Sequence, residues 1–302
     1  MATVSQEEAQ VESITIPVPV RKSSPDHLLR VLGCCNGLLL IGIDQDLFLW
    51  NPLTRYFKNV MSYKCLQDDG YEIVSGLCYN SSIDEYKGVM VLVHFSSDVG
   101  GEYVVIYNLR SKRATMVNFP YELSIVHSGP IVNGSLHWYV PKKGAFCQFP
   151  SHQIIYFDPK TKDFEEIPMP QPKREDGDRI LGLGDLHGCL CMARLVHPSN
   201  HYGSNVEVLA MKEHGVEKSW TMMFIISHIL FCLSNTVVPL GYTKDGEALI
   251  EIGSDEVGQH KSDSSHILAY SPVDYSRRRI MIPNVLFKFN TFMHVESLVN
   301  PS

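Results

Sequence analysis

Two neighbouring stretches decide the fold, Cys34-Cys35-Asn36-Gly37-Leu38-Leu39-Leu40 and Leu47-Phe48-Leu49-Trp50-Asn51-Pro52-Leu53-Thr54-Arg55, because weaker copies of both return downstream. The first returns as Asn133-Gly134, His187-Gly188 and Asp245-Gly246, each followed by a partly apolar run. Five residues mark the copies of the second at intervals of 57, 50, 53 and 60 residues: Trp50, Tyr107, Phe157, Ala210 and Tyr270. Such a regular interval is typical of a repeat architecture.

Each stretch predicts a β-hairpin. Asn-Gly and Asp-Gly pairs supply the positive φ of a tight turn, and the apolar residues after them fit a half-buried strand. In the second stretch, Asn51 and Pro52 end a strand in a turn; after the related Asp158, the returning strand begins at Phe164. Two linked hairpins make a four-stranded sheet, which buries both faces only by stacking on similar sheets.

We therefore predict an all-β fold, a propeller-like ring of four-stranded antiparallel blades. Five units are visible in the sequence, and a further unit closed by both chain ends would give about six blades. The alternative is a β-sandwich whose turns happen to recur.

The domain organisation follows from length and composition. A chain of 302 residues with 44% hydrophobic content can bury a substantial core, and we see no internal linker, so one domain is predicted over residues 31–302. Residues 1–30 are expected to form a flexible or edge-strand lead-in, because Pro17 and Pro19 confine any strand there to a sheet edge.

Charge and hydropathy exclude several partners. A net charge of −7 argues against nucleic-acid binding, and the basic triplet Arg277-Arg278-Arg279 is interpreted as a solvated turn. The apolar residues 222–233 are too few for a membrane span of about twenty and predict an interior strand, so no membrane association is expected. Without a signal-peptide pattern, we expect an intracellular protein, cytoplasmic or nuclear, with free thiols.

Metal and redox sites are minor alternatives. His187, Cys189 and Cys191 alternate along one predicted strand and could offer three ligands, but no second ligand pair accompanies them. Vicinal Cys34 and Cys35 would point to opposite faces of a strand, which suits one packed and one outward thiol better than redox chemistry. We expect no cofactor.

Catalytic motifs are absent from the sequence. No serine lies in a G-x-S-x-G motif, and the paired acidic residues lie without a recognisable catalytic spacing. A propeller-type hydrolase would need a cluster of carboxylates or histidines at one face, and a carbohydrate-binding module would need exposed Trp or Tyr platforms. Because Trp50, Trp138 and Trp220 all lie in repeat motifs, core packing is favoured and both readings remain alternatives.

A family resemblance is carried by several stretches in a fixed order: residues 35–39, 48–55, 76–80, 84–89, 132–138, 154–158, 166–170, 190–191, 211–221 and 239–242. Together they resemble the F-box-associated, kelch-like domain of plant F-box proteins, and the resemblance covers residues 31–270. Each piece alone is only a turn and a strand. The combination and the spacing are what make the resemblance specific.

The resemblance implies a protein-interaction module of the kind that recognises substrates for SCF-type E3 ubiquitin ligases. In such proteins an F-box docks on a Skp-type linker of a cullin ligase, and catalysis belongs to other subunits, so the chain itself is expected to be no enzyme. Residues 1–30 contain neither the Leu-Pro opening nor the length of a helical F-box. Docking on the linker and cullin is therefore expected only if an F-box is supplied, and a truncated chain or a free-standing domain is the expectation here.

The partner, a protein of unknown identity, is expected to bind to loops, because loops on a rigid scaffold vary freely while the core is kept. Two loops combine aromatic residues with polar neighbours. Residues 141–153 contain Phe146 and Phe149, and residues 197–204 contain His201 and Tyr202. Aromatic anchors with polar surroundings are typical of interfaces, so we predict these four residues as partner-binding. The alternative is that their rings fold back onto the sheets.

Overall fold

The structure is a computed structural model. It describes residues 2–4, 11–13, 29–43, 46–62, 71–94, 103–121, 129–142, 151–173, 175, 178–196, 204–229, 235–254, 266–280, 291 and 296–299. Side-chain statements below concern these ranges alone.

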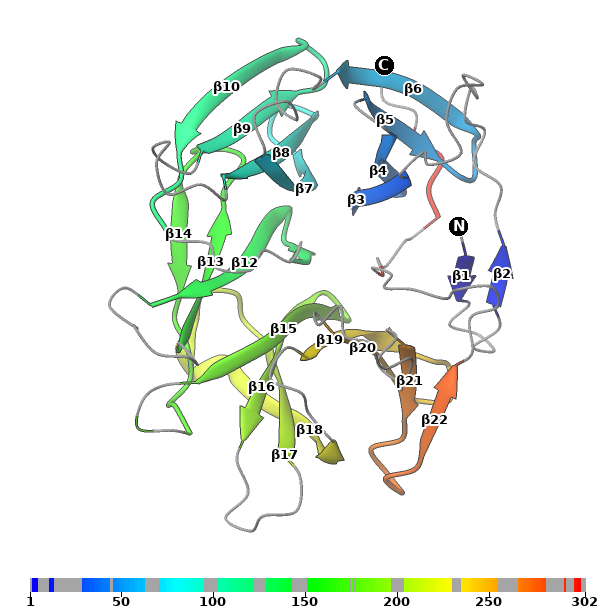
Figure 1. The fold of residues 1–302 in the computed structure, drawn as a ribbon, viewed down its shortest axis with the longest axis vertical. Helices are drawn as coiled ribbons and strands as arrows, with labels where there is room; N and C mark the ends of the chain where they lie inside the picture. The colour runs from blue at the N-terminus through cyan, green and yellow to red at the C-terminus, as the bar shows by residue number, and fades with distance from the viewer. Residues whose placement is uncertain are drawn as a thin grey trace. The chain divides into compact units, whose positions relative to one another are not determined.

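The described residues form five four-stranded sheets, each built from consecutive strands, and one two-stranded sheet (Figure 1). The four-stranded sheets contain β3(Leu29–Cys35) to β6(Tyr56–Ser62), β7(Tyr71–Asn80) to β10(Arg113–Asn118), β11(Ile131–Val132) to β14(Phe164–Ile167), β15(Arg179–Leu186) to β18(Trp220–Ile229), and β19(Asn235–Tyr242) to β22(Arg277–Ile280). Their middle strands are β4(Leu38–Ile43), β5(Asp46–Asn51), β8(Glu85–His94), β9(Tyr103–Asn108), β12(Ser135–Pro141), β13(His152–Phe157), β16(Cys189–Val196), β17(Ser204–Met211), β20(Ala248–Ser254) and β21(His266–Tyr270). The all-β prediction and its four-stranded blade are confirmed, whereas a two-sheet sandwich does not fit.

The expected number of about six blades is corrected to five within the described ranges. The sixth was expected to form from both chain ends. Instead, the described amino-terminal residues form only a two-stranded sheet, β1(Ala2–Val4) with β2(Val11–Ser13). The described carboxy-terminal residues lie against the first sheet, where Asn51 Nδ2 donates hydrogen bonds to the carbonyls of Ser297 and Val299 at 2.8 Å each.

Three of the four predicted tight turns join the first strand of a sheet to the second with the expected geometry, whereas in Asp245-Gly246 only Gly246 has positive φ (84°). Asn36 and Gly37 both have positive φ (49° and 77°), as do Asn133 and Gly134 (53° and 78°). The pair His187 and Gly188 repeats the geometry (56° and 76°). Two consecutive positive φ values are those of a type I′ hairpin turn, which matches the twist of the strands.

The second kind of turn joins the third strand of a sheet to the fourth and is held by an Asn or Asp side chain. Asn108 Oδ1 accepts the backbone N–H groups of Arg110 and Ser111 at 3.0 and 2.8 Å. Asn51 and Asp158 hold their turns in the same way. These side chains replace a backbone turn, which explains why the repeats share Asn or Asp there.

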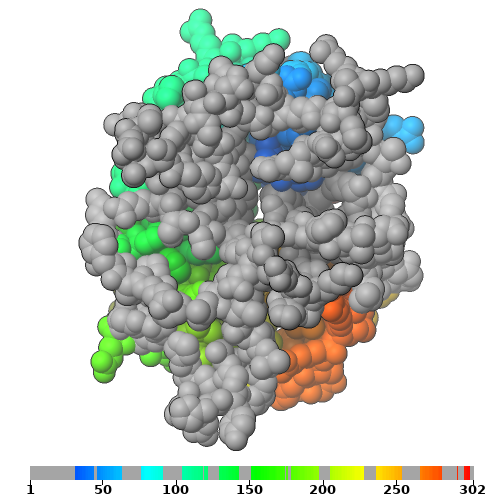
Figure 2. All heavy atoms as spheres, viewed as in Figure 1, coloured from blue at the N-terminus to red at the C-terminus, as the bar shows by residue number. Residues whose placement is uncertain are grey.

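The chain forms two compact units. The β15–β22 unit comprises Met1–Thr15, Gly144–Ile154 and Glu166–Thr291, and the β3–β12 unit comprises Ile16–Lys143, Ile155–Glu165 and Phe292–Ser302. In Figure 2 the β21–β22 hairpin of the first of these units, drawn in orange, lies at the surface of the view.

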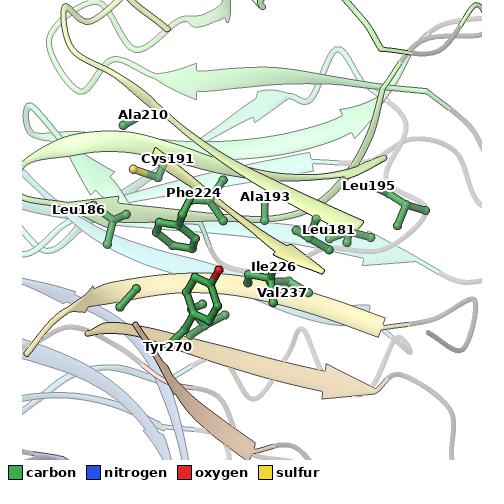
Figure 3. Packing of buried hydrophobic residues seen from close by; sticks show 14 residues of the cluster. Leu181, Leu186, Cys191, Ala193, Leu195, Ala210, Phe224, Ile226, Val237 and Tyr270 are labelled. Atoms are coloured by element: carbon green, nitrogen blue, oxygen red, sulfur yellow. The ribbon is translucent and has the colours of Figure 1, made fainter. Parts of the chain in front are cut away.

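The core of the β15–β22 unit fills the space between its two four-stranded sheets (Figure 3). Phe224 and Tyr270 face each other across this space, with ring centroids 5.4 Å apart. The five residues that marked the sequence repeat, Trp50, Tyr107, Phe157, Ala210 and Tyr270, are all buried on the third strand of their sheets. The spacing of the repeat is therefore the spacing of the blades.

Glycines allow the first strands of successive sheets to approach closely within each unit. A Cβ at Gly184 on β15 would lie 1.8 Å from the Pro239 carbonyl oxygen on β19, and one at Gly182 would lie 2.3 Å from that of Val237. In the β3–β12 unit, a Cβ at Gly33 would lie 2.7 Å from the backbone nitrogen of Leu77. No other residue fits these positions without moving backbone.

One expectation about strand position was wrong. Residues 222–229 belong to β18, the fourth strand of its sheet, which is an edge strand and not an interior one. Phe224 and Ile226 are buried, but Met222 is 54% exposed. The apolar run predicted an interior strand because the sequence does not show that one face of β18 packs on the core while Met222, on the strand, is exposed to solvent.

We predict that Gly184→Ala lowers the free energy of unfolding by about 2–3 kcal/mol, because the added methyl overlaps the Pro239 carbonyl. Gly88→Ala on β8 is the matched control, since its Cβ would meet nothing closer than 4.0 Å, and it should change stability by less than about 0.5 kcal/mol. Urea unfolding midpoints of both variants measure the difference. Equal midpoints would refute the close-approach interpretation.

Candidate functional site

The four residues predicted to bind a partner, Phe146, Phe149, His201 and Tyr202, lie outside the described residues. Their prediction is therefore untested. The strands that carry the two loops are described, however. Loop 141–153 ends at the start of β13, at His152, and loop 197–204 joins the end of β16 to the start of β17.

A buried ion pair joins the two strands that carry the second loop. Arg194 on β16 lies directly opposite Glu207 on β17 in the strand register. The guanidinium Nε and Nη2 atoms donate to Glu207 Oε2 at 3.0 and 2.8 Å. Both residues are buried, with Arg194 only 3% exposed, so this pair sits in a medium where an unpaired charge would be costly.

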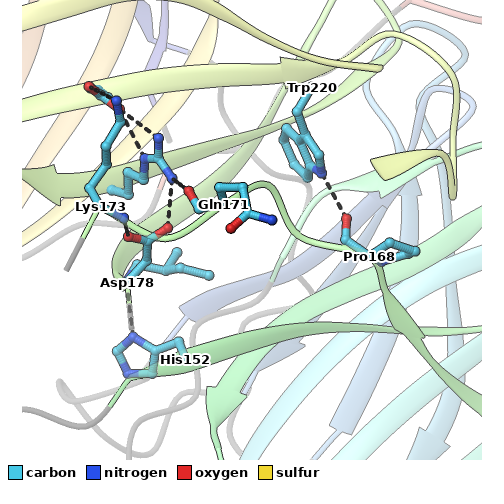
Figure 4. A network of polar contacts seen from close by, with 9 residues as sticks. His152, Pro168, Gln171, Lys173, Asp178 and Trp220 are labelled. Carbon is cyan, nitrogen blue, oxygen red and sulfur yellow. Dashed lines mark hydrogen bonds and ion pairs between the residues drawn. The ribbon is translucent and has the colours of Figure 1, made fainter. Parts of the chain in front are cut away.

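Arg194 also binds a second carboxylate, that of Asp178. Arg194 Nη1 donates to Asp178 Oδ2 at 2.7 Å and to the Gln171 carbonyl at 3.1 Å (Figure 4). Asp178 Oδ1 accepts the backbone N–H of Lys173 at 2.8 Å. Lys173 Nζ also lies 3.8 Å from Glu207 Oε1. We call Arg194, Glu207, Asp178, Lys173 and Gln171, together with His152, the Arg194 network.

His152 connects the first loop to the same network. Its backbone N–H donates to the Asp178 carbonyl at 3.0 Å, and its Nδ1 accepts the backbone N–H of Ile180 at 3.0 Å. Burial, and then the positive charge of Arg179, lower the pKa of His152 to about 4. The ring is therefore neutral at physiological pH, which is the state in which Nδ1 can accept a hydrogen bond.

The segment between β14 and β15 is fixed at another point. Trp220 Nε1 donates to the Pro168 carbonyl at 2.8 Å (Figure 4). With the bonds to Gln171, Lys173 and Asp178, this contact pins the connection that runs from one sheet to the next. One buried polar network within the β15–β22 unit thus joins both strands of loop 197–204 to His152, where loop 141–153 ends.

The Arg194 network is suited to positioning and not to proton transfer, since Asp178 and Glu207 both accept hydrogen bonds from the same guanidinium. Sequence reasoning missed it. A usable signal existed, because Arg194 and Glu207 are single charges in two otherwise apolar strands joined by one loop. Pairing the residues of the two strands outward from that loop would have placed Arg194 opposite Glu207.

The comparison with known families decides what this scaffold is. A sequence model of the F-box associated beta propeller domain matches residues 2–250. The chain belongs to this family. The match confirms the resemblance seen in the repeats, and it agrees with the four-stranded blades of the structure.

Arabidopsis thaliana contains relatives of this F-box associated domain. F-box protein CPR1 is 29% identical over 266 residues, which are 79% of this chain and 62% of the relative. F-box protein At4g22390 is 24% identical over 231 residues, or 69% of this chain and 54% of the relative. The chain thus spans little more than half the length of these proteins.

Solved structures also align with the F-box associated domain. A chain of the mitotic checkpoint complex has a TM-score of 0.42 and 9% identity, covering 90% of this chain and 88% of that chain. The tricorn protease has a TM-score of 0.40 and 12% identity, covering 90% of this chain and 32% of that chain. At these scores the alignments add nothing to the assignment.

The minor metal candidates of the F-box associated domain have structural roles. The His187 ring stacks on Tyr242 with centroids 5.1 Å apart, and Cys191 is buried, with its thiol donating to the Cys189 carbonyl at 3.4 Å. Within the described ranges, no group of three or more His, Cys, Asp or Glu side chains is arranged to hold a metal ion.

The vicinal thiols behave as the strand geometry predicted. Cys35 is buried and Cys34 is half-buried. Burial raises the pKa of the Cys34 thiol to about 12, and burial also raises that of Cys35. Both are therefore protonated and poor nucleophiles.

In the part of the chain that the structure describes, we find no helix with the length and hydropathy of a membrane span.

We predict that Arg194→Met lowers the free energy of unfolding by about 3–5 kcal/mol, because it leaves two buried carboxylates without their cation. Lys173→Met removes a half-exposed cation at the edge of the network and should cost less than about 1 kcal/mol. Chemical denaturation of both variants measures the contrast. A cost for Arg194→Met no larger than that of the control would contradict the network.

His152 should make stability depend on pH. Between pH 6.5 and about 4 the unfolded chain binds a proton at His152 that the folded chain does not, so stability falls as pH falls through this window. The loss of folding free energy across this window is about 3 kcal/mol. His152→Asn, whose Oδ1 can accept the Ile180 N–H, should flatten this part of the pH profile. An unchanged slope in the variant would show that another group dominates.

Proposed function

We propose that this chain holds a protein substrate for an SCF-type E3 ubiquitin ligase, with loops 141–153 and 197–204 as the recognition surface. Phe146, Phe149, His201 and Tyr202 supply the aromatic contacts. The observation that carries the proposal is the Arg194 network, which ties both strands of loop 197–204, and the strand that follows loop 141–153, to one buried support in a domain of the F-box associated family.

Fixing the base of a loop favours recognition for a thermodynamic reason. Binding costs less when the contacting residues are already held near their bound positions. Arg194 and Glu207 close the hairpin that carries loop 197–204, and the bond between His152 and Asp178 fixes the end of loop 141–153. The aromatic residues can then vary between proteins of this kind while their strands stay in place.

The chemistry of ubiquitin transfer belongs to partner subunits in this proposal, and the chain itself is not an enzyme. Docking on a Skp-type linker and a cullin takes place when an F-box is supplied. The cytoplasm and the nucleus are the proposed compartments. Support comes from the family match and from relatives that carry the name F-box protein.

The two alternative functions find no support in the described residues. A carbohydrate-binding module needs a platform of exposed Trp or Tyr rings, but Trp50 and Trp138 are each 2% exposed, and the 71% exposed Tyr275 lies in the β21–β22 turn with neither of them beside it at the surface. The Trp220 indole is engaged with the Pro168 carbonyl. A hydrolase needs carboxylates free to exchange protons, whereas Asp178 and Glu207 are both held by Arg194.

Proximity labelling in Arabidopsis cells, with the proteasome inhibited, tests the proposal. A fusion of this chain to a biotin ligase should label a reproducible set of proteins with raised ubiquitin content. Replacing Phe146, Phe149, His201 and Tyr202 by Ala should remove most of that set, because the aromatic anchors carry most of the binding energy.

The matched control replaces two exposed apolar side chains on outer strands, Met116→Ala with Met222→Ala, and should leave the labelled set intact. Equal melting temperatures of both variants exclude unfolding as the cause. An identical labelled set for the wild type and the four-residue variant would contradict the proposed surface. Recovery of a Skp-type linker with the chain would show separately that docking occurs.

A further inference from the structure

Asn51 uses the two ends of its side-chain amide for different tasks. Its Oδ1 accepts the backbone N–H groups of Leu53 and Thr54 at 3.0 and 3.3 Å, which holds the β5–β6 turn. Its Nδ2 donates to the carbonyls of Ser297 and Val299 at 2.8 Å each, which lie 246 and 248 residues further along the chain. Because Asn51 is fully buried, these two carbonyls satisfy both of its N–H donors.

The corresponding turns of the next two sheets show that the turn itself does not need the amide nitrogen. Asp158 has no side-chain N–H, and yet its Oδ1 holds the β13–β14 turn. Asn108 holds the β9–β10 turn, and its Nδ2 donates to Glu85 on the neighbouring strand β8 at 2.6 Å. The nitrogen of Asn51 is therefore explained by residues 297–299 and not by its own turn.

The segment bound to Asn51 has a local conformation that suits this amide. Ser297 Oγ accepts the backbone N–H of Val299 at 3.1 Å, a turn that serine side chains commonly form. The turn leaves both carbonyls within reach of one nitrogen. In an extended strand, the carbonyls of residues two apart would lie about 7 Å from each other, too far for one nitrogen to bind both at this distance. Asn51 therefore selects a turn.

The side chains of the segment differ in how they meet the protein. Val299 is half-buried and packs against the core cluster that includes Leu49 and Tyr107. Glu296 is exposed, and Leu298 is 81% exposed. The contacts therefore specify a serine that closes the turn, then any residue, then an aliphatic residue.

Few contacts hold this segment. Within the described residues 296–299, the hydrogen bonds to the rest of the protein are the two from Asn51, and Val299 supplies the contact with the core. A segment held in this way stays bound chiefly because it belongs to the same molecule, which gives it a high effective concentration. A separate polypeptide with the same pattern would compete for the same place.

We propose that Asn51 and the core surface beneath Val299 form a binding site for a Ser-x-aliphatic turn, which residues 297–299 of the same molecule occupy. The ligand class is a short serine-containing segment of a polypeptide. The chain's own segment is then an internal competitor for such a turn in a partner protein. The site lies in the β3–β12 unit, whereas the Arg194 network lies in the β15–β22 unit, so this proposal does not rest on the proposed function.

The test uses a peptide with the sequence of residues 295–302, labelled with fluorescein at its amino terminus. Its partners are the wild-type chain and the full-length variant Ser297→Gly/Val299→Gly, in which the internal segment is weakened. Fluorescence anisotropy should show at least about tenfold tighter binding to this glycine variant, because the wild-type segment competes at high effective concentration. Equal affinity for the two proteins would contradict occupation by the chain's own segment.

Asn51→Asp, added to the glycine variant, tests the amide. Aspartate keeps the Oδ1 acceptor of the turn, as Asp158 does, but it replaces both donors by a carboxylate that repels the carbonyls. The peptide should bind about tenfold more weakly, because two hydrogen bonds are lost. Asn133→Asp in the same background is the matched control, since it makes the same change at an exposed turn of the same unit, where Asp-Gly fits the type I′ geometry. It should leave the affinity unchanged.

Substitutions in the peptide give a readout that needs no change at Asn51. Val299→Asp in the peptide should abolish binding to the glycine variant, because a charge would meet the apolar core surface. Leu298→Gln in the peptide should leave binding unchanged, because this side chain is exposed. Alanine at the four predicted recognition residues of loops 141–153 and 197–204 should also leave it unchanged, which separates this site from the loops.

Three results would overturn the binding site itself. They are undetectable binding of the peptide to the glycine variant, equal affinity for the Val299→Asp peptide, and an effect of Asn133→Asp as large as that of Asn51→Asp. Weaker binding after the alanine substitutions would assign the peptide to the recognition loops instead.

Discussion

The close approach of first strands is the constraint on which the remaining structure depends. β15 and β19 come together because Gly182 and Gly184 have no side chain to hold the Val237 and Pro239 carbonyls away. Gly33 does the same between β3 and β7. Once these strands are in contact, the faces of successive sheets can bury residues such as Phe224 and Tyr270 against each other. Without the glycines, each sheet would leave an apolar face in water.

The strands of this scaffold are joined by two kinds of connection, tight turns and longer loops. The tight turns are determined by their own chemistry, through Asn-Gly pairs or an Asn or Asp side chain that closes the turn. The two strands of loop 197–204, and the strand that follows loop 141–153, are held instead by contacts with segments further along the chain. The Arg194 network supplies that support for loops 141–153 and 197–204, and its buried charges make the arrangement specific, since each ion has one place where it is satisfied. Under the proposed function, recognition and stability therefore depend on the same residues of the β15–β22 unit.

The sequence alone predicted what depends on local periodicity. The recurrence of Trp50, Tyr107, Phe157, Ala210 and Tyr270 gave the strand order, and the Asn-Gly pairs gave the turns. It could not predict contacts between segments far apart in the chain, such as His152 with Asp178 or Lys87 with Pro159. Within the described ranges the blade count is five and not about six, because the chain ends contain no repeat motif that fixes their pairing. Phe146, Phe149, His201 and Tyr202 remain sequence predictions, since they lie outside the described residues.

Hydrogen exchange followed by mass spectrometry tests the central claim most directly, which is that locked first strands form the rigid base for recognition. We expect the backbone amides of β15 and β19 around Gly184 and Val237, and those of β16 and β17 beside Arg194 and Glu207, to be among the slowest in the chain, because they exchange only when the fold opens globally. Rapid exchange of these strands, at the rate of exposed turns such as that of Lys112, would contradict the account.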